Sequence, residues 1–206
     1  DVGDAQVVVA VSDEDGKINL NLASPQRIEA LFRAAGADDA QLTIARKAIK
    51  AWASEDTLKS LSMTGLPQGG FASIEELYRV PGLPKALVDR IEPSLSLWSP
   101  EDPNLAHASE LTVSAVTGAS AEASRDFVAR VRAMSPTDSS FPPMPGTSPG
   151  SVARTISGTY TIDSKATVKG GQSITLRVTI GLISEPGDPR AYRVLRWREL
   201  SSAGEG

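Results

Sequence analysis

The chain has 206 residues, with 25 acidic and 21 basic side chains, 40% hydrophobic residues and no cysteine. This length and apolar content are enough for one domain, or two small ones, with a buried core, which excludes a wholly disordered chain. The net charge of -4 disfavours a general polyanion binder, and the lack of cysteine excludes disulfides, thiolate metal sites and a cysteine nucleophile.

Hydrophobic patterning predicts a soluble chain. No run reaches the roughly 18 apolar residues of a membrane helix, and residues 1–4 have neither the charged nor the apolar region of a signal peptide. The chain begins without methionine, so we expect a processed or trimmed fragment, which leaves room for an upstream targeting or anchoring segment.

The first segments predict two strands and then a helix. Residues 6–11 (Gln-Val-Val-Val-Ala-Val) read as a strand, and residues 13–16 (Asp-Glu-Asp-Gly) as a solvated turn into a second strand at 17–20. A helix follows, with Ser24 as N-cap, Pro25 in its first turn and Gly36 as its stop. Its apolar face has helical spacing and consists of Ile28, Leu31, Phe32 and Ala35.

Three further helices are predicted before residue 92. One covers about residues 39–53, with Asp38 or Asp39 free to cap it and with Leu42, Ala45, Ile49 and Trp52 on its inner face. Residues 73–76 (Ser-Ile-Glu-Glu) form a capping box for a short helix that ends at residues 80–82. The last short helix has an apolar face of Leu87, Val88 and Ile91.

A weak internal repeat joins this region to residues 104–131. Residues 21–23 (Asn-Leu-Ala), Leu31, Gly36 and Ile49 recur as residues 104–106, Leu111, Gly118 and Val131. Both copies read as an asparagine-containing turn, a helix, a glycine stop and a second helix. We therefore expect two related helical hairpins.

The pattern changes after a segment rich in proline, serine and glycine at residues 135–150, which we interpret as an exposed linker. Residues 155–168, 173–183 and 191–199 alternate with a period of two, as strands do. Net charge changes as well, from -7 over residues 1–140 to +3 over the remainder. The simplest arrangement is an α+β fold: an antiparallel sheet built from residues 1–20 and 151–206, and an inserted all-α domain of helical hairpins at residues 21–134.

Few residues suggest chemistry. His107 is the only histidine and no nucleophile pattern accompanies it, so we interpret it as a structural or surface residue beside a helix start. Residues 13–16 lack the later glutamate of a calcium loop. Arg190, Arg193, Arg196 and Arg198 form a basic cluster on one strand, where arginines commonly protect a sheet edge; a partner or an anionic surface is the alternative. Trp52, Trp98 and Trp197 are interpreted as core residues.

Residues 71–91 resemble a helix-hairpin-helix unit, with Val-Pro-Gly-Leu at 80–83 between two short helices. In DNA-binding versions, the turn and the following helix present backbone amides to a phosphate. Here Glu75, Glu76, Asp89 and Glu92 surround Arg79, Lys85 and Arg90. This charge balance favours a protein-packing role and leaves a nucleic-acid-binding module as the alternative function.

Three segments together resemble the type II secretion system minor pseudopilin K family, also called general secretion pathway protein K. Residues 15–23 (D-G-K-I-N-L-N-L-A) resemble the family's approach to its helical domain. Residues 71–82 (F-A-S-I-E-E-L-Y-R-V-P-G) fit its F-x-S-x-x-E-L-x-x-V-x-G stretch, and residues 103–106 (P-N-L-A) are a degraded second asparagine turn. The order of the segments carries the resemblance, because each alone is weak.

The resemblance implies a pilin-like sheet with an inserted α-domain, and an upstream hydrophobic helix that anchors the protein in the inner membrane. In the family, an acidic and often calcium-binding insertion follows a D-W-x-D-x-D pattern, but here residues 52–56 keep only two acids and residues 57–70 are poor in oxygen ligands. We therefore expect no cofactor and no catalytic, cofactor-binding or metal-binding residues; calcium is left as an alternative that the missing acids disfavour.

The implied function is structural rather than enzymatic. The chain would be the periplasmic part of a minor pseudopilin at the tip of the type II secretion pseudopilus, where it helps to initiate filament assembly for protein export across the outer membrane. The implied partners are the minor pseudopilins I and J, with H as a further companion. The alternative of another class is the helix-hairpin-helix nucleic-acid-binding module.

Overall fold

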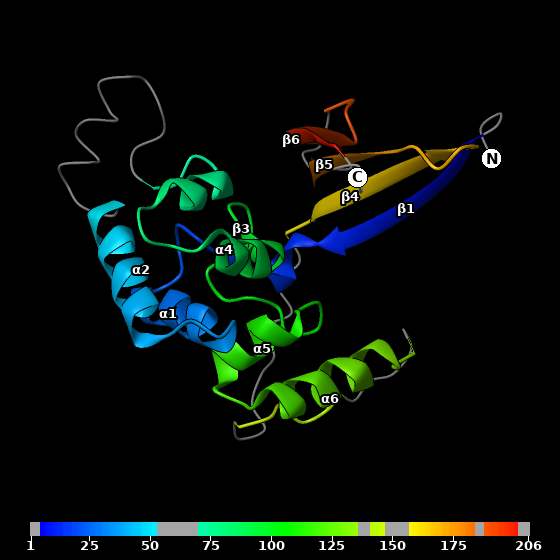
Figure 1. Cartoon of the computed structure of the whole chain (residues 1–206). Coiled ribbons are helices and arrows are strands. Elements are labelled where there is room, and N and C mark those ends of the chain that lie inside the picture. Colours follow the sequence, from blue (N-terminus) through cyan, green and yellow to red (C-terminus); the bar gives the residue numbers. More distant parts are fainter. Residues whose placement is uncertain (1–4, 53–69, 136–140, 147–156, 184–187, 202–206) are drawn as a thin grey trace. The chain divides into compact units, whose positions relative to one another are not determined.

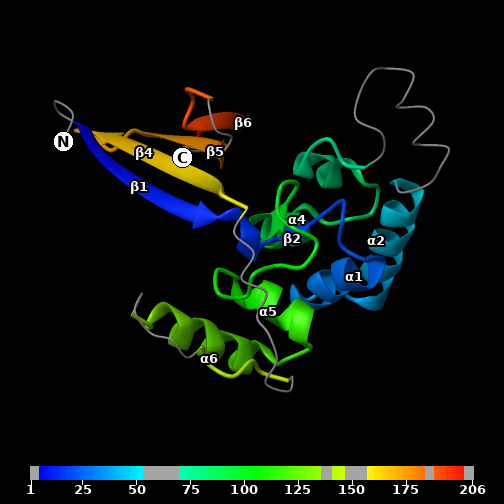
Figure 2. The same ribbon diagram turned by 180° about the vertical axis from the view of Figure 1, so that it is seen from behind.

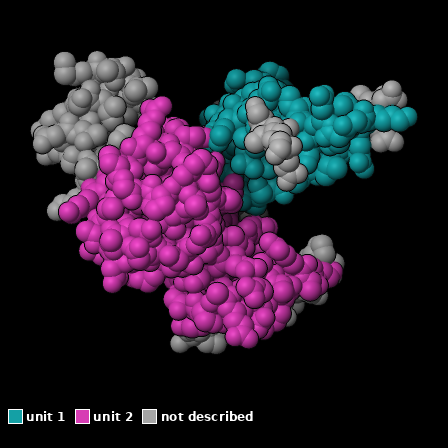
Figure 3. All heavy atoms as spheres, in the orientation of Figure 1, with its two compact units in different colours: residues 1–14, 156–206 teal, residues 15–155 magenta. Residues whose placement is uncertain are grey.

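The computed structural model describes residues 5–52, 70–135, 141–146, 157–183 and 188–201 (Figures 1 and 2). The protein is a mixed α+β structure with a four-stranded antiparallel sheet. The chain forms two compact units, coloured in Figure 3. Residues 1–14 and 156–206 are called the sheet unit below, and residues 15–155 the helical unit.

Both ends of the chain contribute to the sheet. Its strands are β1 (Ala5–Asp13), β4 (Thr159–Val168), β5 (Ser173–Leu182) and β6 (Tyr192–Ser201), in the order β1-β4-β5-β6. The sequence predicts hairpin connections at Gly170-Gly171 and at residues 186–188. The first joins β4 to β5, where the N–H of Gly171 donates to the carbonyl of Val168 at 3.0 Å. Residues 186 and 187 of the second lie outside the described residues.

The predicted hairpin at residues 6–20 is wrong. Glu14–Gly16 forms a short 3-10 helix (η1), and β2 (Ile18–Asn19) pairs in parallel with β3 (Leu95–Ser96) instead of with β1. Ile18 and Leu95 are both buried, so this pairing completes an apolar core that a hairpin with β1 would leave open. Along the chain, the first boundary between the two units falls between residues 14 and 15. The sequence predicted this boundary between residues 20 and 21.

Three helices, α1, α2 and η2, begin at the predicted caps. Ser24 Oγ accepts the N–H of Arg27 at the start of α1, and Asp38 accepts that of Gln41 at the start of α2. Glu76 Oε1 accepts the N–H of Ser73 at 3.2 Å, as a capping box requires. The helices are α1 (Pro25–Ala34), α2 (Asp39–Trp52), η2 (Ile74–Arg79), α4 (Lys85–Ile91), η3 (Glu92–Ser94), α5 (Glu110–Thr117) and α6 (Ala121–Arg132).

Two hydrophobic clusters form the core of the helical unit. The larger joins α1, α2, η2 and α4 to β2 and β3, and its fully buried side chains include Ile18, Ile28, Leu31, Val88 and Ile91. The smaller lies between α5 and α6 around Phe127. Phe141 and Met144 pack against it, and the rings of Phe127 and Phe141 meet edge to face at 5.7 Å. This part of the predicted linker therefore supplies core residues, because its two large apolar side chains find a hydrophobic partner.

The internal repeat is present in a different register. Asn19, rather than Asn21, corresponds to Asn104, because each side-chain oxygen accepts the N–H of the residue two positions later. Ser24 and Ser109 then cap the first helix of each hairpin in the same way. The second helices begin after Asp38 and Ser120.

Candidate interaction surface

The strand register separates apolar from polar side chains in the sheet unit. Side chains directly opposite each other in antiparallel strands share a face, and one such row runs through Val11, Ile162, Val178 and Trp197. We call this side the apolar sheet face. Its hydrophobic members are Val7, Val9, Val11, Tyr160, Ile162, Ala166, Val168, Ile174, Leu176, Val178, Ile180, Leu182, Tyr192, Val194 and Trp197.

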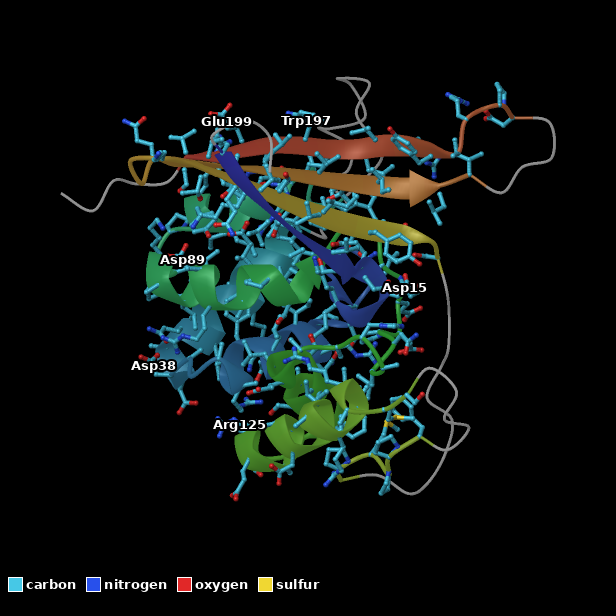
Figure 4. All side chains as sticks on the ribbon, turned by 90° about the vertical axis from the view of Figure 1, so that its right-hand side faces the viewer. Asp15, Asp38, Asp89, Arg125, Trp197 and Glu199 are labelled. Carbon is cyan, nitrogen blue, oxygen red and sulfur yellow. The ribbon has the colours of Figure 1, made fainter. Side chains whose placement is uncertain are left out.

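Much of the apolar sheet face is exposed. Val9, Val11 and Trp197 have exposed fractions of 57%, 64% and 63%. Trp197 and Glu199 lie on this face of β6, and both are labelled in Figure 4. The prediction that Trp197 is a core residue is wrong, whereas Trp98 is half-buried and the side chain of Trp52 lies outside the described residues. A contiguous apolar surface of this kind marks an interaction site in soluble proteins.

The described part of the sheet unit has no apolar core of its own. Every buried hydrophobic side chain of the described residues belongs to the helical unit. In the described part of the sheet unit, the buried side chains are instead polar: Glu14, Thr159, Thr161 and Thr179. A sheet with one apolar face gains its stability by burying that face against another layer. Among the described residues, no hydrophobic side chain of the apolar sheet face is buried by such a layer.

The opposite side, called here the polar sheet face, is internally bonded. The Asp163 carboxylate accepts two hydrogen bonds from the Arg177 guanidinium, at 2.7 and 2.8 Å. Thr161 Oγ1 donates to Glu14 at 2.7 Å and lies 2.8 Å from the hydroxyl of Thr179. These polar groups satisfy one another, so this face does not need an apolar layer.

The predicted basic cluster divides into two parts. Arg193, Arg196 and Arg198 lie on the polar sheet face of β6, which is an edge strand as predicted. Burial lowers the pKa of Arg196, the neighbouring Arg198 adds to this effect, and Glu14 opposes it. Arg190 precedes the strand and forms an ion pair with Asp188 at 2.7 Å, which lowers the pKa of that carboxyl.

Of the other candidate residues, the structure describes His107, Glu14 and Asp15. His107 is exposed and lies two residues before the helix cap Ser109, in agreement with the prediction of a surface residue. Glu14 and Asp15 are almost fully buried, so the predicted solvated turn is wrong. In the ranges that the structure covers, no three histidine or acidic residues are grouped to hold a metal ion. The segment discussed for calcium lies mainly at residues 53–69, outside the described residues.

The helix-hairpin-helix segment packs against the protein at its turn. A Cβ added to Gly82 would lie 2.8 Å from Cδ1 of Ile44 on α2, so this glycine faces a neighbouring helix. The Tyr78 hydroxyl lies 2.7 Å from both Asp89 and Glu92; Asp89 is labelled in Figure 4. Burial first, and then these two carboxylates, raise the pKa of Tyr78. Acidic groups beside the turn disfavour a phosphate at this position.

Two segments that carry the family resemblance contact each other. Asn21 Nδ2 donates to the carbonyl of Phe71 at 3.0 Å, and Asn21 Oδ1 accepts the N–H of Phe71 at 2.7 Å. The buried Asn19 amide accepts from the N–H groups of Asn21 and Leu22 and donates to the carbonyl of Ser99. Both asparagines therefore fix the path of the chain into α1.

Comparison with protein-family models and with curated proteins finds no match for this chain. Over the parts of the chain that the structure describes, no helix combines the length and the hydropathy needed to cross a bilayer. The geometry thus defines the class of the protein: a mixed α+β chain whose most prominent candidate site is an exposed apolar face of a sheet.

From the sequence, the hydrophobic residues of the strands could belong either to the core or to an interface. Val7, Val9 and Val11 have the period-two spacing of one strand face, but Val8 and Ala10 between them are also apolar, so the sequence does not single out one face. The sequence could not show whether a helix covers them, because burial depends on elements distant in the chain. The structure leaves them exposed.

Proposed function

We propose that this chain is the periplasmic, non-enzymatic part of a K-type minor pseudopilin. In this proposal it lies at the tip of the type II secretion pseudopilus, helps to initiate the filament, and associates with the minor pseudopilins I, J and H. The pilin-like sheet and the inserted helical domain belong to the same proposal. The observation that carries it is the exposed apolar sheet face on strands drawn from both ends of the chain.

The uncovered face fits the helix that the resemblance places upstream of residue 1. An α-helix with its side chains is about 10–12 Å wide. Four strands at about 4.8 Å spacing span about 14 Å between their outer axes. A single apolar helix would therefore cover most of the face. The edge strands, with Val9 on β1 and Val194 on β6, would remain for companion subunits.

Two further observations support the proposal. The helices lie in the sequence between β1 and β4, as an inserted domain requires. The motif segments at residues 15–23 and 71–82 contact each other through two hydrogen bonds between Asn21 and Phe71. The resemblance therefore rests on segments that are neighbours in the fold. The contact of Gly82 with Ile44 gives less support to the nucleic-acid alternative, because that turn is occupied by protein.

The test combines this chain with the soluble domains of the companion pseudopilins I and J. Size-exclusion chromatography with light scattering should show a heteromer at concentrations of about 10–50 μM, a range in which moderate affinities are populated. The substitutions Val9→Asp and Val194→Asp should weaken the heteromer, because each puts a charge on the apolar sheet face. Val8→Asp is the matched control: Val8 is as exposed as Val9, at 57%, but lies on the opposite face.

The outcome that would contradict the proposal has two parts. The companions fail to bind this chain, and full-length protein in membranes fails to cross-link to them. Salt-sensitive binding of a DNA duplex at low ionic strength would then favour the helix-hairpin-helix alternative. If Val8→Asp and Val9→Asp weakened the heteromer equally, the partner would not bind specifically to the apolar sheet face.

A further inference from the structure

The two edges of the sheet are protected to different degrees. Edge strand β6 carries Arg193, Arg196, Arg198 and Glu199, and its register shifts at an extra residue, Leu195. Charged side chains and bulges are the usual devices that stop an edge from pairing with another chain. Edge strand β1 has one charged residue, Asp13 at its end; residues 5–12 carry no charge and no proline, and the register with β4 is unbroken.

Strand β1 also exposes valines on both of its faces. Val7, Val9 and Val11 lie on the apolar sheet face, whereas Val8 lies on the polar sheet face, and all four are exposed. Within the described residues, β1 pairs with β4 alone. The backbone N–H and C=O groups on its other side can therefore pair with a further strand. Figures 1 and 2 both show β1 at the border of the sheet.

We propose that β1 is a self-association site, at which β1 strands of two copies of this chain pair antiparallel about a two-fold axis. The pairing is centred on Val9, so that Val7 lies opposite Val11 of the second copy and Ala5 lies opposite Asp13. The two sheets become one eight-stranded sheet. This inference goes beyond the proposed function, because it concerns the edge of the sheet and needs no companion protein.

The register follows from the faces. A pairing centred on a residue matches odd-numbered with odd-numbered positions, so the valines of the apolar sheet face meet across the new interface and the two apolar faces join. A pairing shifted by one residue would place Val7 opposite Ala10 and join an apolar face to a polar one. The register centred on Val9 is therefore favoured, because it joins the apolar faces of the two copies to each other and likewise the polar faces.

Charge explains why a second copy fits this edge and not the other. Two β1 strands bring no like charges opposite each other, since Asp13 meets Ala5. Two β6 strands would bring their arginines together, which destabilises a pair. Pairing β1 of one copy with β6 of the next would repeat without end and give an open chain of molecules. Pairing β1 with β1 about a two-fold axis gives a closed dimer.

A single introduced cysteine tests the two-fold axis directly. The natural chain has no cysteine, so Val9→Cys supplies the only thiol. Opposite residues in antiparallel strands have Cα atoms about 4.5–5.5 Å apart, which is within the range of a disulfide. We expect Val9→Cys to form a disulfide-linked dimer under mild oxidation. Val194, on the other edge strand, is exposed to a similar degree (52%, against 57% for Val9), and Val194→Cys should remain monomeric on a non-reducing gel.

Lysine substitutions separate an edge pair from stacking of two apolar faces. For the edge pair, sedimentation equilibrium should show that Val8→Lys and Val9→Lys each weaken the dimer by about tenfold or more, because each puts two lysines near the axis. Val194→Lys should leave it unchanged. Stacked faces would give a different pattern, in which Val9→Lys and Val194→Lys dissociate the dimer and Val8→Lys does not.

Three results would overturn the inference: a monomer at about 100 μM, cross-linking of Val194→Cys as fast as that of Val9→Cys, or the stacking pattern among the lysine variants. Circular dichroism verifies that each variant is folded. These measurements use this chain alone, so their failure leaves the heteromer test of the proposed function unaffected.

Discussion

At the scale of single residues, buried polar groups and close contacts fix the path of the chain. The side chain of Asn19 bonds to three backbone groups, and that of Asn21 to two groups of Phe71. A buried amide that loses such partners is costly, at about 1–3 kcal/mol for each unsatisfied group. The asparagines of the I-N-L-N-L-A segment are therefore explained by hydrogen bonding.

Gly16 gives a prediction at this scale. A Cβ at this position would lie 2.2 Å from the backbone oxygen of His107, so the substitution Gly16→Ala must separate two backbone segments. We expect a loss of about 3 kcal/mol or more in the free energy of unfolding, as for other severe overpacking. Denaturant titration of the purified variant measures it.

Gly118→Ala is the control for Gly16→Ala. Gly118 has a φ of 71° and nothing within 4 Å of an added Cβ, so only backbone strain of about 1 kcal/mol is expected. Equal losses in the two variants would contradict the role assigned to the contact between Gly16 and His107.

At the scale of elements, Glu29 links the first helical hairpin. Its carboxylate accepts from Arg33 of α1 at 2.7 Å and from Arg46 of α2 at 2.8 Å. Arg46 first, and then Arg33, hold the pKa of Glu29 below its usual value of 4.5. Because the pKa is lower in the folded chain than in the unfolded one, the ionised carboxylate stabilises the fold above the unfolded pKa, and this contribution is lost as the pH falls through the folded value.

The substitution Glu29→Gln should therefore lower stability at pH 7, with a difference from the natural chain that closes as the pH falls below about 4. Denaturant titrations at several pH values provide the measurement. Glu110→Gln is a suitable comparison, because its ion pair with Arg125 is longer, at 3.6 Å, and should give a smaller difference. A difference for Glu29→Gln that stays constant down to pH 2 would refute the assignment.

Elements differ in how well the sequence predicts them. Helices α1, α2 and α4 follow from apolar spacing and caps such as Ser24, because these signals act between residues a few positions apart. The pairing of β2 with β3 could not be predicted, since Ile18 and Leu95 are far apart in the sequence and local patterns do not specify which distant segments pair. The exposure of Trp197 depends in the same way on which layer covers β6.

At the scale of the whole molecule, the two compact units differ in how they are stabilised. The helical unit buries its apolar side chains in two clusters around Phe32 and Phe127, whereas the described part of the sheet unit buries no large hydrophobic side chain. Burial of apolar area is the main stabilising contribution to folding, at about 25 cal/mol per Å². The sheet unit should therefore be the less stable of the two when no partner covers it.

Hydrogen exchange measured by mass spectrometry tests this difference. Backbone amides of β4 and β5 should exchange faster than those of α1 and α5 in the isolated chain, because local stability follows apolar burial. Adding a partner that covers the apolar sheet face should slow exchange in the strands and leave α1 unchanged. Strands as protected as α1 without any partner would mean that the sheet is stable by itself.

The sequence by itself determined the α+β class, the strands at both ends of the chain, the helices with their caps, and the motifs that resemble the pseudopilin K family. These features depend on neighbouring residues, whose spacing is fixed by the chain. Only the tertiary structure decided the burial of Glu14 and Asp15, the register that aligns Val11 with Trp197, and which strand lies unprotected at the edge. Those features depend on contacts between segments far apart in the sequence, and a local pattern cannot specify them.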